Sequence, residues 1–237
     1  MRLPGPLLIT LVIAASAAVI SVIVFVAWVV SSGNVDDSGR PVRAATIDDL
    51  PHIVLQPKDV PDEFVQLTAN EFTKLKTTGE YSSIASYETA FELPRDQAAP
   101  GETVCIVSIA ALYPDGEAAE AALRKPIQQL EAAARRGAEA GSQIQDLRVT
   151  EPASLPRAVA AEYFSPSTSY CAAFENEPAS VHLVRFEDQF QGQFVIGTIA
   201  MFVFETGSAS DDPMELARLQ QDRTRDWLAS TGIESPQ

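Results

Sequence analysis

The pattern of hydrophobic and polar positions divides the chain into an apolar N-terminal run, a polar stretch and a longer region of mixed periodicity. The run from Leu7 to Val30 contains no charged residue. Its 24 residues exceed the ~20 that an apolar helix needs to cross the ~30 Å hydrocarbon core of a bilayer. The pattern therefore predicts one transmembrane helix that contacts the lipid bilayer through Leu7 to Val30.

A cleaved signal peptide is the alternative interpretation of this apolar run. The hydrophobic core of such a peptide is usually only ~7–15 residues long, so the length favours an uncleaved anchor. Arg2 precedes the run, whereas Asp36 and Asp37 are the first charges after it. Because Lys and Arg stay on the cytoplasmic side, we expect a single-pass protein of the cell membrane with its C-terminal domain outside.

Three parts of the chain follow from these patterns. Residues 1–33 are expected to form a short cytoplasmic N-terminus and the transmembrane anchor, residues 34–54 a flexible linker, and residues 55–237 an extracytoplasmic α+β domain. The linker is polar, rich in small residues and without apolar periodicity. Its start resembles a calcium loop, but the twelfth position of such a loop must be a bidentate Glu, and here it is Ala45.

Extended patterns predict the strands of the domain. Residues 103–113 and 193–205 are apolar on both alternating faces, which is typical of central strands that are covered on both sides. Gln191 and Gly192 suit a hairpin turn before the second of these segments. Further strands are predicted over residues 81–93, 144–150, 157–164 and 181–190.

Helical periodicity predicts a first main helix over residues 117–140, with Asp115 as its N-cap. Pro126 lies inside this helix and is expected to kink it or split it in two. The apolar residues that share one face are Leu123, Ile127, Leu130 and Ala134.

A second main helix is predicted to begin after Asp212, because Pro213 at the first turn and Glu215 three residues after the cap are start signals. Arg223 is expected to extend over the sheet edge, with its guanidinium in water or on a carboxylate. The stripe expected to dock this helix on the sheet consists of Leu216, Leu219 and Trp227.

The order of these elements predicts an α+β fold, in which two main helices pack on one face of an antiparallel or mixed sheet, preceded by one N-terminal transmembrane helix. The formal net charge of the chain is −15. Because a surface this acidic repels phosphate backbones, binding to nucleic acid is excluded as a function.

The two cysteines, Cys105 and Cys171, both lie in the part expected outside the membrane, where disulfides form. One interpretation is two buried thiols that each act as a small hydrophobe. The even count in an exported domain favours a disulfide between Cys105 and Cys171. Neither residue belongs to a CxxC pair, so redox chemistry is not expected.

Catalytic chemistry has little support in the sequence. The only histidines are His52 and His182, which are too few and too far apart for a zinc site, and no nucleophile elbow, P-loop or dinucleotide fingerprint occurs. Glu187 and Asp188 are adjacent in a predicted strand and should point to opposite faces, unlike the facing carboxylates of a glycosidase. We therefore assign no catalytic, cofactor-binding or metal-ligating residue.

Three segments carry a resemblance to a known group of proteins: LQPKDVPDEF, SIAALYPDGEAAEAAL and VHLVRFEDQFQGQFVIGTIAMF. Together they resemble bacterial extracytoplasmic sensor-like domains, such as the outer sensor domain of mycobacterial serine/threonine kinases and related lipoproteins. In the first segment, Val60 and Glu63 replace the Leu and Gly that are common in that group. The resemblance implies an α+β fold and a binding or sensing role, and it transfers no site residue.

The sequence as a whole favours a membrane-anchored, extracytoplasmic binding or sensor-like module that is not an enzyme. Its partner would be an unknown protein or small-molecule ligand, and no cofactor is expected. The alternative is an envelope-associated hydrolase without a recognisable motif. A concave site with apolar walls would favour binding, whereas convergent histidine, serine or paired carboxylates would favour hydrolysis.

Overall fold

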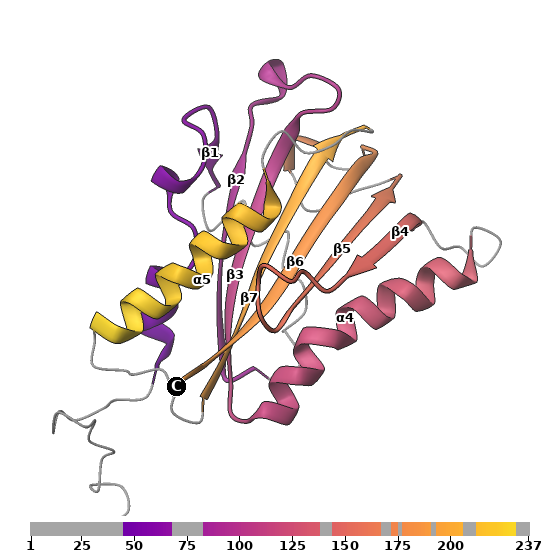
Figure 1. Ribbon diagram of the computed structural model, residues 1–237. Coiled ribbons are helices and arrows are strands. Elements are labelled where there is room, and N and C mark those ends of the chain that lie inside the picture. The colour runs from indigo at the N-terminus through magenta and orange to yellow at the C-terminus, as the bar shows by residue number, and fades with distance from the viewer. Residues whose placement is uncertain are drawn as a thin grey trace, which may run out of the picture. The chain divides into compact units, whose positions relative to one another are not determined.

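The computed structural model describes residues 45–67, 83–137, 144–166, 172–174, 177–190, 193–205 and 212–230 (Figure 1). The chain separates into two compact units, Met1–Arg43 and Ala44–Gln237, and all the described residues belong to the second. The predicted anchor, Leu7 to Val30, lies outside the described residues. Among the helices that are described, none is long and apolar enough to span a bilayer.

The described part of the chain is built on one seven-stranded sheet in the order β1-β2-β3-β7-β6-β5-β4, and all neighbouring strands are antiparallel. This confirms the α+β fold with an antiparallel sheet. The strands are β1 (Val65–Gln66), β2 (Ala85–Glu92), β3 (Thr103–Tyr113), β4 (Gln145–Thr150), β5 (Ala158–Ser165), β6 (Ala179–Phe190) and β7 (Gln193–Phe204).

The strand order follows from two meanders and one crossover. The chain runs from β1 to β3, crosses through α4 (Gly116–Arg136) to the far edge at β4, and returns strand by strand until β7 pairs with β3. The two strands predicted as central, β3 and β7, therefore lie in the middle of the sheet. Every residue of β3 is buried, as its apolar character on both faces requires.

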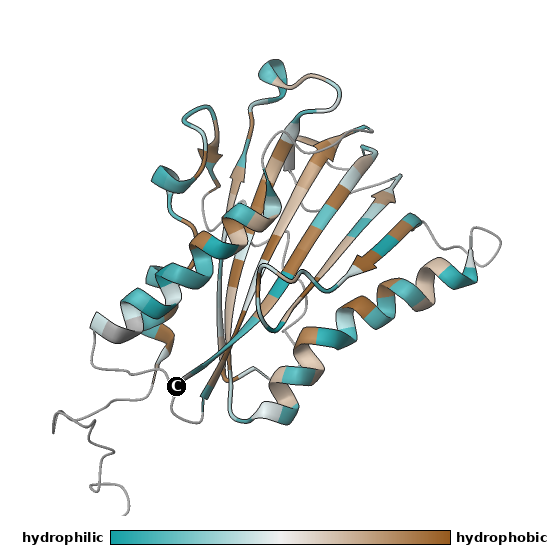
Figure 2. Ribbon diagram, viewed as in Figure 1, coloured by the Kyte–Doolittle hydropathy of each residue, from teal (hydrophilic) through white to brown (hydrophobic). Residues whose placement is uncertain are grey.

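The two main helices, α4 and α5 (Pro213–Ser230), pack on opposite faces of the sheet, so the prediction that both lie on one face is wrong. Leu216 of α5 clusters with Ile106, an even-numbered residue of β3, whereas Leu123 of α4 clusters with Ala111, an odd-numbered residue of the same strand. Side chains alternate between the faces of a strand. Strands that are apolar on both faces, brown in Figure 2, need a cover on each side.

Helix α4 begins as predicted, because the Asp115 carboxylate accepts a 2.8 Å hydrogen bond from the Ala118 N–H. Pro126 does not split it: one α-helix runs through the proline to Arg136. The helix ends before Gly137, whose φ of 68° favours glycine. Its buried side chains are small or aliphatic: Ala119, Ala122, Leu123 and Ile127.

A glycine in β7 sets the packing on the α5 face. A Cβ atom at Gly197 would lie 2.1 Å from the Cζ atom of Phe186 on the neighbouring strand β6. Both residues are in register, and Phe186 is fully buried. The absence of a side chain at Gly197 therefore allows the Phe186 ring to lie over the sheet beneath α5.

The folded unit begins earlier than predicted. Residues 45–54, which the sequence analysis assigned to the flexible linker, form η1 (Ile47–Asp49) and α2 (Leu50–Ile53). Leu50, Ile53 and Val54 are almost completely buried and cluster with Leu112 and Trp227. The domain boundary thus moves from residue 55 to Ala44.

This N-terminal segment also changes the role of two residues on α5. The sequence analysis expected Leu219 and Trp227 to dock α5 on the sheet. Instead, Trp227 packs with the cluster around α2, and Leu219 remains 38% exposed. The periodicity identified the correct helix, but it could not show that a second element covers part of its apolar stripe.

The predicted disulfide stays a prediction, because Cys171 lies outside the described residues. Cys105 is fully buried on β3, opposite Glu92 of β2. The Glu92 carboxylate accepts a 2.5 Å hydrogen bond from the N–H of Ala173, which follows Cys171 by two positions in the sequence. Phe174 packs in the same cluster as Cys105.

Candidate functional site

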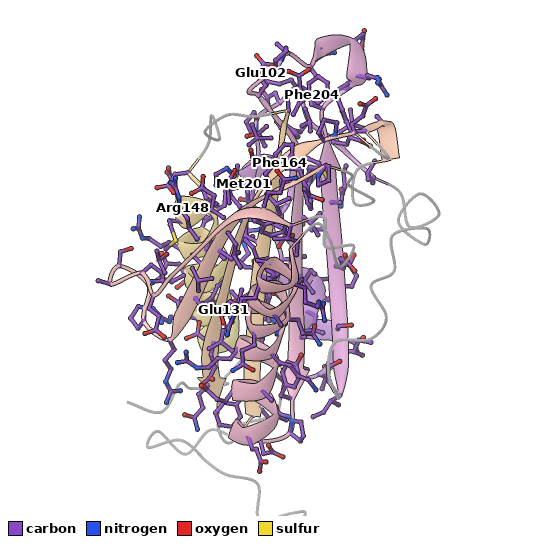
Figure 3. The ribbon with its side chains drawn as sticks, turned by 90° about the vertical axis from the view of Figure 1, so that its right-hand side faces the viewer. Glu102, Glu131, Arg148, Phe164, Met201 and Phe204 are labelled. Atoms are coloured by element: carbon purple, nitrogen blue, oxygen red, sulfur yellow. The ribbon has the colours of Figure 1, made fainter. Side chains whose placement is uncertain are left out.

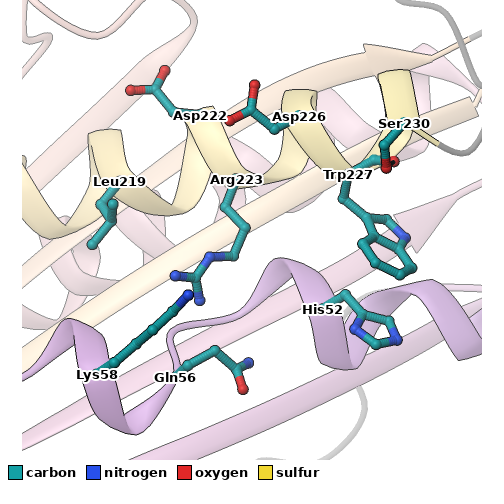
Figure 4. Close-up of a pocket in the computed structure, with 9 residues that line it drawn as sticks. All are labelled: His52, Gln56, Lys58, Leu219, Asp222, Arg223, Asp226, Trp227 and Ser230. Atoms are coloured by element: carbon teal, nitrogen blue, oxygen red, sulfur yellow. Dashed lines mark hydrogen bonds between the residues drawn. The ribbon is translucent and has the colours of Figure 1, made fainter.

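A hollow of about 600 Å³ lies between the N-terminal segment and α5 (Figure 4). Four elements or connections contribute to it: α2, the turn that leads from it, η2 (Pro57–Asp59) and the C-terminal two thirds of α5. Its lining residues are His52, Gln56, Lys58, Leu219, Asp222, Arg223, Asp226, Trp227 and Ser230.

A buried polar network holds α5 and the N-terminal segment on the sheet. The Ser108 hydroxyl of β3 accepts a 3.1 Å hydrogen bond from the Leu55 N–H and donates one of 3.2 Å to Gln220 Oε1. Gln220 Nε2 in turn donates to the Ile109 carbonyl at 2.9 Å. Ser108 and Gln220 are completely buried, so these bonds fix the position of both walls of the hollow.

Trp227 forms an aromatic wall of the hollow. Its ring stacks on the exposed imidazole of His52, with the ring centroids 3.8 Å apart and the planes inclined by 14°. Its Nε1–H donates a 3.0 Å hydrogen bond to the buried Asp49 carboxylate. A tryptophan held from two sides is a rigid surface that offers contact area at little cost in conformational entropy.

Arg223 fastens α5 to η2 beneath the hollow. Its guanidinium donates to the Val54 carbonyl at 3.1 Å and to Asp59, from which it lies 2.5 Å. Both side chains of this ion pair are largely withdrawn from solvent, with 17% and 6% of their surfaces exposed. The sequence analysis left two positions open for the Arg223 guanidinium, water or a carboxylate, and it lies on the carboxylate of Asp59. Lys58, beside Asp59, is exposed and extends into the hollow (Figure 4).

The hollow contains histidine, serine and carboxylates, but they do not form a catalytic constellation. The Ser230 hydroxyl donates to the Trp227 carbonyl of its own helix at 2.8 Å. The carboxylates of Asp222 and Asp226 point away from His52 and Lys58 in Figure 4. A nucleophile needs a base within hydrogen-bond reach, and none of the hydrogen bonds among these lining residues joins His52 to Ser230.

The second histidine lies elsewhere, in a smaller hollow of about 350 Å³ at the other end of α5. His182 of β6 is directly opposite Glu162 of β5. Its Nε2 atom is buried and has no hydrogen-bond partner among the described residues. Burial lowers the pKa of His182, and the nearby Glu162 carboxylate opposes this shift.

Glu187 and Asp188 point to opposite faces of β6, as predicted. Glu187, on the α4 face, forms a 2.7 Å ion pair with Arg157, and burial raises its pKa against the effect of that charge. Asp188, on the α5 face, forms a 3.2 Å ion pair with Arg225 of α5. Burial raises the pKa of Asp188 to about 6, which the Arg225 charge partly opposes.

Metal binding finds no support in the described ranges, where no group of three or more His, Cys, Asp or Glu side chains could hold an ion. The sequence analysis did not identify Gln56 and Lys58 as parts of a site, because it assigned no regular element or motif to their segment. One signal could have been used: Arg223 interrupts the apolar stripe of α5, and a conformationally fixed arginine needs a carboxylate from another element.

Comparison with known proteins gives no family for this chain: no family model matches it, and no curated protein sequence does. Among solved structures, one likeness is to the Ran-binding protein Mog1p of Saccharomyces cerevisiae, at 10% sequence identity. The match covers 75% of this chain and 77% of that chain, with a TM-score of 0.29. A similarity at this level supports no argument about fold or function.

Proposed function

We propose that the chain is a membrane-anchored, extracytoplasmic binding or sensor-like module without catalytic activity, and that the hollow between α2 and α5 is its recognition surface. The observation that supports this proposal is the rigid Trp227–His52 stack, which lines the same hollow as an exposed cation, Lys58. Aromatic side chains with a fixed orientation and a few polar neighbours are typical of ligand and partner sites.

The hydrogen bonds around the hollow support binding rather than hydrolysis. Arg223 and Ser230 already have partners within the fold, and they hold the walls in place. Lys58, which extends into the hollow, is exposed and can meet a ligand without first breaking a contact of the core, whereas Asp222 and Asp226 of α5 are exposed but point away from Lys58 and His52. Leu219, 38% exposed, adds an apolar surface on α5 beside them. This division between fixed walls and accessible polar groups suits recognition.

Site-specific photo-crosslinking in cells tests the recognition surface. A benzoylphenylalanine at Leu219 of the full chain is expected to form one discrete adduct, which is lost when Lys58→Glu is added. The matched control places the same group at Arg135, an exposed position on α4. Equal labelling from both positions, or an adduct unaffected by Lys58→Glu, would contradict the assignment of the hollow.

The absence of catalysis is tested with the purified full chain and generic ester, peptide and glycoside substrates. We expect no turnover above the buffer rate. Turnover that falls at least ~100-fold in His182→Ala or His52→Ala, the lower end of what a general base contributes, would overturn the binding-module proposal.

The membrane part of the proposal has its own test. The full chain is expected to fractionate with membranes, and protease added to intact or wall-stripped cells is expected to remove the domain. A mature protein that begins near residue 31 and is recovered outside the membrane fraction would instead support the signal-peptide alternative.

A further inference from the structure

The smaller hollow is lined by a row of polar side chains that crosses three strands. Arg148 of β4 is directly opposite Glu162 of β5, and Glu162 is directly opposite His182 of β6. Residues paired in this way project from the same face of a sheet. The row therefore presents a cation, a carboxylate and an imidazole side by side at the edge of the sheet, on the face that carries α5; Figure 3 labels Arg148 on the edge strand.

These three side chains have few partners within the described part of the chain. No ion pair joins Arg148 to Glu162 there, although the two are cross-strand neighbours and both are exposed. The Nε2 atom of His182 is buried without a hydrogen-bond partner among the described residues. A buried polar atom of this kind costs free energy unless a hydrogen-bond partner satisfies it.

Apart from Thr150, the rest of the lining is apolar and closes the hollow on one side. Ala160 and Val184 form its floor on β5 and β6, and Met214 at the start of α5 forms a wall. The volume of about 350 Å³ lies at the lower end of the range for small-molecule sites. Asp212 caps the start of α5, where its carboxylate accepts a 2.8 Å hydrogen bond from the Met214 N–H, and it is not among the residues that line the hollow.

We propose that this hollow binds a free α-amino acid with an apolar side chain, at a second site separate from the recognition surface between α2 and α5. The carboxylate of the ligand pairs with the Arg148 guanidinium, whose fork geometry matches it. The α-ammonium pairs with Glu162, next to the imidazole of His182 that lines the same hollow. The apolar side chain packs on Ala160, Val184 and Met214. A zwitterion fits a row that carries both charges, whereas a simple anion would meet the Glu162 carboxylate.

Isothermal titration of the full chain in detergent with L-leucine tests this site. We expect saturable binding with a dissociation constant below ~1 mM. Leucinamide, which lacks the carboxylate, and 4-methylpentanoate, which lacks the amine, are each expected to bind at least ~10-fold more weakly, because each leaves one charged side chain without its partner. Binding of either analogue as tightly as L-leucine would overturn the zwitterion assignment.

Three variants locate the site. Arg148→Gln, Glu162→Gln and His182→Gln are each expected to weaken L-leucine binding at least ~10-fold. Arg135→Gln on α4, where the arginine pairs only with Glu131 among the described residues, is the matched control and should leave binding unchanged. No heat of binding up to ~10 mM L-leucine, or binding unaffected by Arg148→Gln and Glu162→Gln, would refute the proposal.

Discussion

The two faces of the sheet are covered by helices of similar length that dock in different ways. Helix α4 buries only alanine, leucine and isoleucine side chains among its described residues. Helix α5 buries Leu216 and Ala217, but also Gln220, Gln221 and Thr224. One face is therefore held by hydrophobic packing, whereas the other combines hydrophobic packing with buried hydrogen bonds and ion pairs between α5, the sheet and the N-terminal segment.

We propose that this difference separates the part of the fold that provides stability from the part that provides recognition. Apolar packing leaves no accessible polar group at the interface, and it stabilises the fold in proportion to the area that it buries. A helix docked through polar contacts leaves hollows at its ends, where side chains from several elements meet. Both hollows described above lie along α5, one at each end. We infer that α4 serves mainly to complete the core and that the α5 face carries the binding surfaces.

The largest expected effect on the free energy of unfolding comes from a disulfide that we predict between Cys105, on the sheet face that carries α4, and Cys171. On the chain-entropy model, a bridge that closes so long a loop stabilises by about 4–5 kcal/mol before strain is subtracted. The free energy of unfolding, measured by chemical denaturation, should be higher for the oxidised chain than for the double variant Cys105→Ala/Cys171→Ala by up to this amount. Mass spectrometry after alkylation in denaturant without reductant should find neither thiol labelled, and labelling of both would exclude the bridge.

Truncation of a buried aliphatic side chain tests how far α4 depends on packing. Ile127 is 4% exposed and clusters with side chains of β3, β5 and β7. Ile127→Ala should lower the free energy of unfolding by ~2–5 kcal/mol, measured by urea denaturation. The control is Arg124→Ala, three residues before Ile127 on the same helix. It removes exposed ion pairs with Glu120 and Glu151 and should lower the free energy of unfolding by at most ~1 kcal/mol. Equal losses would show that packing does not dominate on this face.

The α5 face should instead respond to pH through Asp188. The pKa of its carboxyl rises from 3.8 to about 6 on folding, mainly because of burial, with Arg225 opposing and Asp222 of α5 adding to the shift. Between these two values the folded state binds more protons than the unfolded state, so the free energy of unfolding decreases as pH rises from 3.8 to about 6. The total change is at most about 3 kcal/mol.

Asp188→Asn removes this titration and should flatten the dependence of unfolding free energy on pH in that window. Urea denaturation of both proteins at several pH values between ~4 and ~7 measures the difference. A parallel pair of pH profiles would show that Asp188 titrates as it does in the unfolded chain.

The sequence was sufficient for the parts of the fold that depend on local pattern. The alternation in residues 103–113 and 193–205 identified both central strands, and Asp115 and Asp212 marked both helix starts. The placement of α4 and α5 on opposite faces was missed, although two strands that are apolar on both sides already demand two covers. The helical segments in residues 45–54 were missed because they are short, and their burial depends on Trp227, far along the chain.

Candidate site residues were harder to predict, because both hollows are made by contacts between distant segments. Lys58 and Trp227 line the same hollow only because η2 and α5 pack together, and no spacing in the sequence indicates that packing. Arg148, Glu162 and His182 become neighbours through strand register. The sequence analysis assigned no site role to His182. The register between β4, β5 and β6, which brings the three residues together, cannot be derived from the sequence of any one of these strands.

The smallest predicted effect tests the polar docking of α5 directly. Ser108 links three elements, because its hydroxyl receives the Leu55 N–H and donates to Gln220 Oε1. Ser108→Ala removes both bonds and leaves a buried N–H and a buried amide oxygen without this partner, which should cost ~1–3 kcal/mol. Ser86→Ala on β2, an exposed serine of the same sheet, is the control and should change the free energy of unfolding by no more than ~0.5 kcal/mol.

Amide hydrogen exchange tests the same contact locally. Because the Leu55 N–H loses its acceptor, its exchange should accelerate in Ser108→Ala while that of Ala118 on α4 does not. Acceleration at both amides would mean that the two faces unfold together, and the contrast drawn between them would then be wrong.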